Sequence, residues 1–244
     1  KTNQVRSNNF AVFQGAAGTV TVNSAQTITG MQFATDGYSL VNGAAGSLSL
    51  VNGELGNATV RVDPNATATV GTALNGSATL GKYDRGTLVL NAANGYTGGT
   101  VLNGGKIVVG NNAALGTGAL TAADSTVLDS NVAVALGNNV VLNGALNVTG
   151  SNALTLGGVV SGTGSLIKSG ASSLTLNGNN SYSGGTLLNG GTLVLGNNAA
   201  LGSGALVFKS GTTLDSSNTA SLFNAADLDA SLTLAGSHDL TLSG

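Results

Sequence analysis

Residues 98–120 read GGTVLNGGKIVVGNNAALGTGAL, and residues 184–206 read GGTLLNGGTLVLGNNAALGSGAL. All but five positions of these two stretches are identical, and the offset between them is 86 residues (184 − 98 = 86). The same offset continues outward, because Leu128-Asp129-Ser130 matches Leu214-Asp215-Ser216. Self-similarity at a fixed period is typical of solenoids, in which each repeat packs on its neighbours.

Within each copy, apolar residues alternate with hydroxyl residues. Leu154-Thr155-Leu156 and Leu174-Thr175-Leu176 follow the period of a strand that has one face in a core. Asn-Gly, Gly-Gly and Asn-Asn pairs separate the strands and favour sharp turns, since they tolerate positive φ. The pattern predicts an all-β parallel β-helix of about eleven rungs, with four rungs of about 21 to 22 residues in each repeat. A β-propeller also repeats four strands, but its blades run to about 40 to 50 residues.

The composition narrows the class of protein and its partners. Charged residues are 7% of the chain and the only proline is Pro64, which suits strands that are hydrogen-bonded on both sides. There is no cysteine, so disulfides, thiolate metal sites and cysteine nucleophiles are excluded. Eight basic and ten acidic residues are scattered singly, so we expect no nucleic-acid partner. No apolar run reaches about 18 residues, and no signal peptide is visible.

The first 40 residues differ in amino-acid composition from the rest. Large side chains gather there, namely Phe10, Phe13, Met31, Phe33 and Tyr38. An open solenoid end exposes strand edges and core, so we predict that residues 1–40 form an N-terminal cap and the first rungs. A specialised binding tip is the alternative. Residues 41–244 are predicted to form the β-helix built on the 86-residue repeat.

The ionisable residues do not suggest a catalytic site or a metal site. His238 is the only histidine and replaces Asn152 of the previous copy, which indicates an exposed turn position. Without a second histidine there is no expected zinc site or Ser-His-Asp arrangement. Asp129 and Asp215 recur in both copies and are interpreted as turn residues that accept backbone N–H bonds. We therefore predict no catalytic residue, no metal, no cofactor and no small-molecule substrate.

Three further sets of residues are candidate sites. Asp227 and Asp229 could point out from one face, but their counterparts Val141 and Asn143 carry no charge. Arginines are few, and no repeat copy gathers them near carboxylates. Tyr96 and Tyr182 share one repeat position beside glycines. They are the candidate surface recognition residues, because an aromatic side chain on a convex turn can contact a partner. The alternative is that each ring covers neighbouring glycine backbone.

Two segments resemble a known family. Residues 164–170 (GSLIKSG), 174–176 (LTL), 180–186 (NSYSGGT) and 188–193 (LNGGTL) resemble the autotransporter-associated β-strand repeat of type V secreted passengers. Residues 86–105 match it too, although the start of that copy, residues 78–82 (ATLGK), departs from the pattern. The resemblance implies a right-handed β-helix cut from a longer passenger, and a C-terminal β-barrel translocator in the full-length protein. It also implies a place at the bacterial cell surface, anchored in the outer membrane or secreted.

These observations favour a non-catalytic function. We expect an adhesin or self-association rod whose partner is a host-cell surface, a matrix surface or another copy of itself. The near-identity of the copies leaves open a structural stalk or folding scaffold that presents another domain. A polysaccharide-active β-helix enzyme is the third alternative, and the lack of clustered charge speaks against it.

Overall fold

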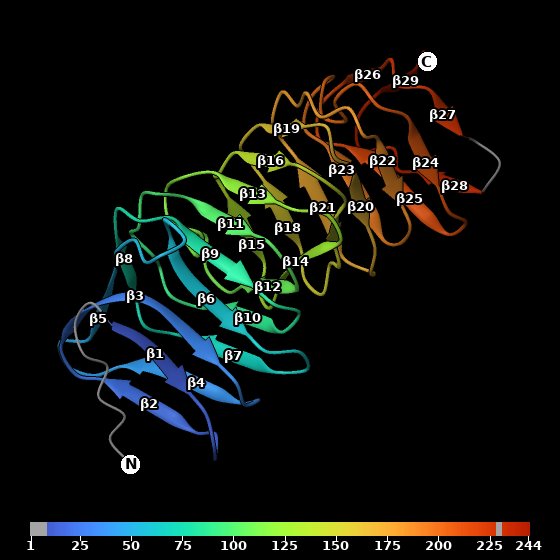
Figure 1. Cartoon of the computed structure of the whole chain (residues 1–244). Coiled ribbons are helices and arrows are strands. Elements are labelled where there is room, and N and C mark those ends of the chain that lie inside the picture. Colours follow the sequence, from blue (N-terminus) through green and yellow to red (C-terminus); the bar gives the residue numbers. More distant parts are fainter. Residues whose placement is uncertain (1–8, 228–230) are drawn as a thin grey trace. The chain divides into compact units, whose positions relative to one another are not determined.

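The computed structural model describes residues 9–227 and 231–244, and every regular element in them is a β-strand (Figure 1). The chain divides into two compact units, one ending at Leu120 and the other beginning at Thr121. No helix among the described residues is long and apolar enough to cross a membrane. The parallel strands form a β-solenoid of about 12 turns, close to the expected eleven. The all-β parallel β-helix predicted from the sequence is confirmed.

The first unit contains two parallel sheets. One has the strand order β8-β5-β3-β6-β9-β11, with β1 also paired to β3. Its strands are β1 (Asn9–Phe13), β3 (Ala25–Phe33), β5 (Ser47–Leu50), β6 (Ala58–Val62), β8 (Leu74–Gly76), β9 (Leu80–Tyr83) and β11 (Thr100–Leu102). The second sheet follows the chain order β2 (Thr19–Val22), β4 (Tyr38–Asn42), β7 (Thr67–Val70), β10 (Thr87–Leu90) and β12 (Lys106–Val109).

The second unit contains parts of three long sheets and one short sheet, with β13 starting at the unit boundary. The first part consists of β13 (Leu120–Ala122), β16 (Val140–Leu142) and β19 (Val160–Gly162). The second consists of β14 (Thr126–Ser130), β17 (Leu146–Val148), β20 (Leu166–Lys168), β22 (Thr186–Leu188), β24 (Leu206–Phe208) and β27 (Ala226–Asp227). The third consists of β15 (Val134–Leu136), β18 (Leu154–Leu156), β21 (Ser173–Leu176), β23 (Thr192–Leu195), β25 (Thr212–Ser216) and β28 (Leu232–Leu234). The short sheet pairs β26 (Ala220–Leu222) with β29 (Leu240–Leu242).

One turn of the solenoid is shorter than the sequence-based estimate. Leu146 pairs with Leu166, and Leu166 pairs with Thr186, so both turns have the same length (166 − 146 = 20 and 186 − 166 = 20). Four such turns (4 × 20 = 80) do not fill the 86-residue repeat. The prediction that one repeat divides into four rungs of about 21 to 22 residues is therefore wrong.

Equivalent residues of the two copies consequently lie on different sheets. Within the second unit, Leu128 lies on β14, whereas its counterpart Leu214 lies on β25 of another sheet. The same change of sheet separates β17 from its counterpart β28. The faces can exchange roles because each strand places an aliphatic residue inward, regardless of its sheet.

The interior is filled by stacked aliphatic side chains, and aromatic side chains fill it near the start. In the second unit a row of leucines follows the register of β18, β21, β23 and β25, and each is at most 1% exposed: Leu154, Leu174, Leu193 and Leu214. In the first unit the rings of Phe13 and Phe33 stack with centroids 4.6 Å apart. The hydroxyl of Tyr38 donates to the backbone carbonyls of Gln14 and Ala16. That residues 1–40 act as a cap stays a prediction.

Candidate functional site

The two tyrosines predicted as surface residues lie in the interior. Tyr96 and Tyr182 are both 0% exposed, so the prediction that they contact a partner is wrong for the folded chain. Each hydroxyl hydrogen-bonds a threonine hydroxyl four residues later, Thr100 at 2.6 Å and Thr186 at 2.5 Å. Burial raises the pKa of Tyr182 to about 12 and raises that of Tyr96 as well.

The alternative for these tyrosines, that each ring covers glycine backbone, fits the packing around Tyr96. A Cβ added at Gly116 would lie 3.0 Å from Cδ2 of the Tyr96 ring and 2.3 Å from the Tyr96 carbonyl oxygen. Gly116 also has φ of +63°, which only glycine adopts without strain. The ring therefore fills the interior where the chain between β10 and β11 forms no strand.

A buried asparagine precedes each tyrosine by two residues and joins three successive turns. In the second unit Oδ1 of Asn180 accepts a bond of 2.7 Å from the Val160 N–H, while Nδ2 donates to the Ala200 carbonyl at 2.6 Å. Asn94 makes the equivalent bonds to Leu74 and Ala114 in the first unit. The side-chain amide thus replaces ladder hydrogen bonds where the strand is interrupted, and it satisfies backbone groups that burial would otherwise leave unpaired.

Each repeat copy also buries a lysine at a corner of the solenoid. Nζ of Lys82 donates to the carbonyls of Tyr83 at 2.7 Å, Asp84 at 2.9 Å and, one turn further on, Gly104 at 3.2 Å. Nζ of Lys168 donates to the carbonyls of Ser169, Gly170 and Gly190 in the same way. Both side chains are 0% exposed. The ammonium therefore holds the carbonyls of two stacked corners together, which is an architectural role.

The buried lysine makes the stability of the chain depend on pH. Burial lowers the pKa of Lys82 to about 8, although the carboxylate of Asp84 acts in the opposite direction. Between about pH 8 and 10.5 the unfolded chain binds a proton that the folded chain has lost, so the free energy of unfolding rises with pH. From pH 7.5 to 9.5 we expect a gain of about 2 kcal/mol for the wild type relative to Lys82→Met, measured by urea unfolding. Parallel pH profiles of the two proteins would show that Lys82 keeps an ordinary pKa.

The recurring aspartates are occupied by the backbone, as expected. Oδ1 of Asp129 accepts bonds from the N–H groups of Ser130 and Ser151, each at 2.9 Å. In the second copy Asp215 accepts from the Ser216 N–H at 2.8 Å and from the Ser237 hydroxyl at 2.9 Å. These contacts fix the turns in which the two aspartates lie.

The single histidine also takes a structural position. Nδ1 of His238 lies 3.0 Å from the Ser216 carbonyl oxygen, and its counterpart Asn152 donates to the Ser130 carbonyl at 3.0 Å. The Ser237 hydroxyl donates to the Asp215 carboxylate. The Nδ1 atom of His238, however, contacts the backbone carbonyl of Ser216 and not that hydroxyl. His238 therefore substitutes for an asparagine that links two turns.

The remaining acidic residues do not converge. Over the described ranges, no three His, Cys, Asp or Glu side chains come close enough to hold a metal ion. Asp227 is exposed on β27, and the second member of the predicted pair, Asp229, lies outside the described residues. The exposed carboxylate of Asp124 accepts a bond from the Ala145 N–H, which lowers its pKa.

One pairing was not anticipated from the sequence. Arg61 makes a two-bond ion pair with Asp84, from Nε to Oδ2 at 2.8 Å and from Nη2 to Oδ1 at 3.1 Å. The expectation that arginines stay apart from carboxylates is wrong here. Residue 61 lies directly beside residue 83 on the neighbouring strand, and this proximity depends on a register that the sequence does not show.

These features define a class of protein. The chain is a parallel β-solenoid whose repeated residues serve its interior and its corners. Residues 82–109 and 166–195 match the passenger-associated-transport-repeat family. The chain is also 36% identical over 194 residues to the protein named Adhesin BmaC autotransporter of Brucella suis biovar 1 (strain 1330). That match covers 73% of this chain and 6% of the relative, and no solved structure matches significantly.

Two segments of the chain carry this repeat, and over most of its length the chain is similar to an autotransporter passenger. Such a passenger lies at the bacterial cell surface, either anchored to the outer membrane or secreted. The same kinship supports a C-terminal translocator in the full-length protein.

Proposed function

We propose that this chain is a non-catalytic segment of a surface adhesin, and that it attaches the bacterium to a host-cell or matrix surface or to a second copy of itself. The observation that carries the proposal is its 36% identity over 194 residues to a protein named as an adhesin. Because the chain corresponds to 6% of that relative, the segment is proposed to contribute to adhesion and not to account for all of it.

The distribution of identical residues supports contact through the outer faces. Lys82 and Lys168, like Asn94 and Asn180, are the same in both copies, and all four are buried. One outward position at which the copies differ is Tyr83, whose counterpart is Ser169. Selection on the interior preserves the solenoid, while the exposed side chains are available for partners.

A structural stalk is the second candidate function, and the same interior networks favour it. Each copy repeats one internal hydrogen-bonding scheme, and such a scaffold would support another domain without contacting a partner. Under this alternative the outer side chains of the segment make no contribution to attachment.

A deletion that respects the turn length separates the two functions. Removing residues 126–205 takes out four whole turns (206 − 126 = 80) and lets β24 follow directly where β14 stood, since Thr126 and Leu206 both begin strands of the same sheet. The passenger is displayed on a non-adherent bacterium and scored for clumping and for attachment to matrix and host cells. Loss of attachment with surface exposure retained supports the adhesin. Unchanged attachment identifies residues 126–205 as a stalk and leaves attachment to the preceding turns.

A matched deletion checks that the solenoid survives. Removing residues 126–211, which is one full repeat (212 − 126 = 86), joins positions that are equivalent in the two copies, so it is also expected to keep the packing although the following strands change sheet. Protease resistance of the displayed passenger should be kept by both deletions.

A further inference from the structure

The outer face of β3, β6 and β9 in the first unit carries a row of planar polar side chains. Gln32 pairs in register with Arg61, and Arg61 pairs in register with Tyr83, so the three lie side by side on adjacent strands. Their strand neighbours Phe33 and Val62 are 0% exposed, which places the row on the opposite, outward face.

Hydrogen bonds hold these side chains in place. The side chain of Arg61 is 50% exposed and that of Asp84 is 25% exposed, so the ion pair stays accessible to a ligand. Nε2 of Gln32 donates to Oδ1 of Asp63 at 3.0 Å. The ion pair uses Nε and Nη2 of Arg61, and the other N–H groups of a guanidinium remain able to donate. Binding to groups that are already ordered costs less conformational entropy.

A second row, beside the first, has almost no side chains of its own. It runs through Gly30, Thr59 and Gly81, and neighbouring groups close over the glycines. A Cβ added at Gly81 would lie 2.8 Å from both Oδ1 of Asn57 and Cε2 of Tyr83. Nδ2 of Asn57 also donates to the Tyr83 hydroxyl at 3.0 Å. The Tyr83 ring is therefore held against bare backbone.

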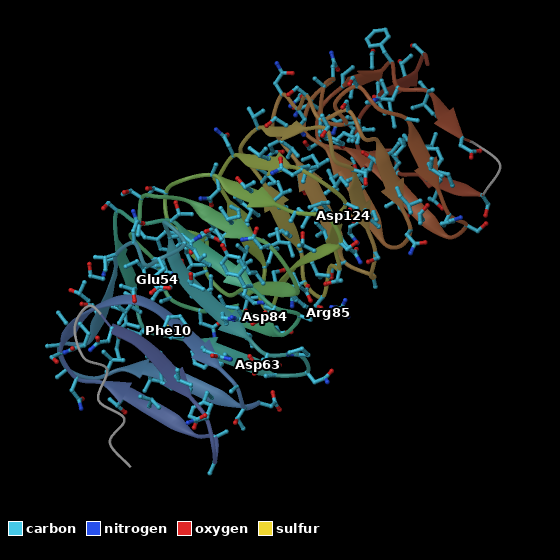
Figure 2. The ribbon with its side chains drawn as sticks, in the orientation of Figure 1. Phe10, Glu54, Asp63, Asp84, Arg85 and Asp124 are labelled. Carbon is cyan, nitrogen blue, oxygen red and sulfur yellow. The ribbon has the colours of Figure 1, made fainter. Side chains whose placement is uncertain are left out.

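The first strand adds a second aromatic ring to this face. A Cβ at Gly30 would lie 2.9 Å from Cε2 of Phe10, so the Phe10 ring packs over that glycine. Phe10 nevertheless keeps 40% of its surface exposed. Figure 2 shows Phe10 near the start of this unit, with Asp63, Asp84 and Arg85 further along it. We call the set Phe10, Gln32, Asn57, Arg61, Tyr83 and Asp84 the β3–β6–β9 patch.

The patch departs from the repeat at the positions that face outward. Lys82 keeps its identity in the second copy as Lys168, but Tyr83 and Asp84 are replaced there by Ser169 and Gly170. Asp84 has φ of +61°, a left-handed conformation, and Gly170 has φ of +88°. The first copy thus retains an aspartate where the second has the residue that fits the backbone without strain. Local folding does not require that carboxylate, which indicates a role on the surface.

We propose that the β3–β6–β9 patch binds a neutral carbohydrate chain. Sugar hydroxyls both donate and accept hydrogen bonds, and the ordered carboxylate, guanidinium and amide groups offer both partners. The apolar face of a sugar ring packs on an exposed aromatic ring, which Tyr83 and Phe10 supply. The charge of the Arg61 guanidinium is neutralised by Asp84, and the carboxylate of Asp63 lies on the neighbouring corner. An acidic polysaccharide would therefore gain little electrostatic attraction from the patch. This inference deepens the adhesin proposal and rests on it for its biological setting.

Two substitutions test the patch without threatening the fold. Tyr83→Ser and Asp84→Gly introduce the residues that the second copy already carries at these positions. Binding of the purified passenger to mannan, dextran and galactan is measured by affinity electrophoresis, with heparin as the acidic probe and Thr175→Ala as the outward control on β21. We expect at least one neutral polysaccharide to bind, and the double variant to lose at least tenfold in affinity while Thr175→Ala does not.

Other outcomes would overturn the proposal. Binding to heparin alone, binding to none of the neutral probes, or equal affinities of wild type and double variant each contradict it. The displayed double variant separates this failure from that of the adhesin proposal. If it attaches to host cells or matrix as the wild type does, the patch is not the attachment surface, whereas adhesion by the segment still stands on the deletion experiment.

Discussion

Replacing Tyr182 with alanine is expected to lower the free energy of unfolding by about 3–5 kcal/mol, the range for truncating a large buried aromatic side chain. The ring is 0% exposed and occupies the interior where the backbone between β21 and β22 forms no strand. Neighbouring turns cannot collapse into the space, because their spacing is fixed by the hydrogen-bonded strands on each side. The midpoint of urea unfolding measures the loss.

Tyr182→Phe is the matched control, since it keeps the ring and removes only the hydroxyl that bonds Thr186. We expect it to cost about 1 kcal/mol, the usual value for one buried hydrogen bond. Alanine and phenylalanine variants of equal stability would mean that the ring does not support the solenoid. Because repeat proteins can unfold in parts, the m-value should be compared between variants before the midpoints are.

The short periods of the sequence predict the fold better than the long repeat does. Leu154-Thr155-Leu156 recurs as Leu174-Thr175-Leu176 (174 − 154 = 20), and the two triplets are register partners on β18 and β21. That spacing is the length of a turn. The 86-residue offset, by contrast, reports the duplicated unit, and its length need not be a whole number of turns. Dividing it by four therefore gives the wrong rung length although the fold class is correct.

Strand parity also explains which interior residues the sequence could identify. Lys168 follows Leu166 by two positions, so the strand period places its side chain inward beside a leucine. A lysine at an inward position requires several acceptors, and corner carbonyls supply them. Tyr182 lies outside any strand, and parity says nothing about such a position. Its burial depends on how the interrupted segment folds back over the interior.

The contacts between surface residues of the first unit could not be predicted from the sequence, for a different reason. Strand β3 pairs with β5 along its first part and with β6 along its second, so residues 51–57 form an insertion between them. The register across this insertion joins Gly30 to Thr59 (59 − 30 = 29), and no repeat offset predicts that spacing. The neighbours Arg61 and Tyr83, and with them the ion pair of Arg61, follow only once that register is known.

Replacing Asn180 with leucine is expected to lower the free energy of unfolding by about 2–6 kcal/mol, because it leaves two buried backbone groups unpaired at about 1–3 kcal/mol each. Leucine branches at the same carbon as asparagine but is larger, so the loss reports the missing hydrogen bonds together with tighter packing, and not a cavity. The groups affected are the Val160 N–H and the Ala200 carbonyl, one turn before and one turn after the substituted residue. Water cannot replace the amide there, since Asn180 is only 5% exposed.

The neighbouring Asn179 provides the control, because it is exposed and Asn179→Leu is expected to change stability by no more than about 0.5 kcal/mol. Amide hydrogen exchange gives a second, local measurement. In the Asn180→Leu variant the N–H of Val160 should lose protection first, and protection should fall next in the turns on either side. If Val160 stays protected and the two leucine variants unfold at the same urea concentration, the three-turn bridge does not stabilise the solenoid. A local loss without a global one would confine its effect to the interrupted strand, because each turn of a solenoid contacts only its neighbours.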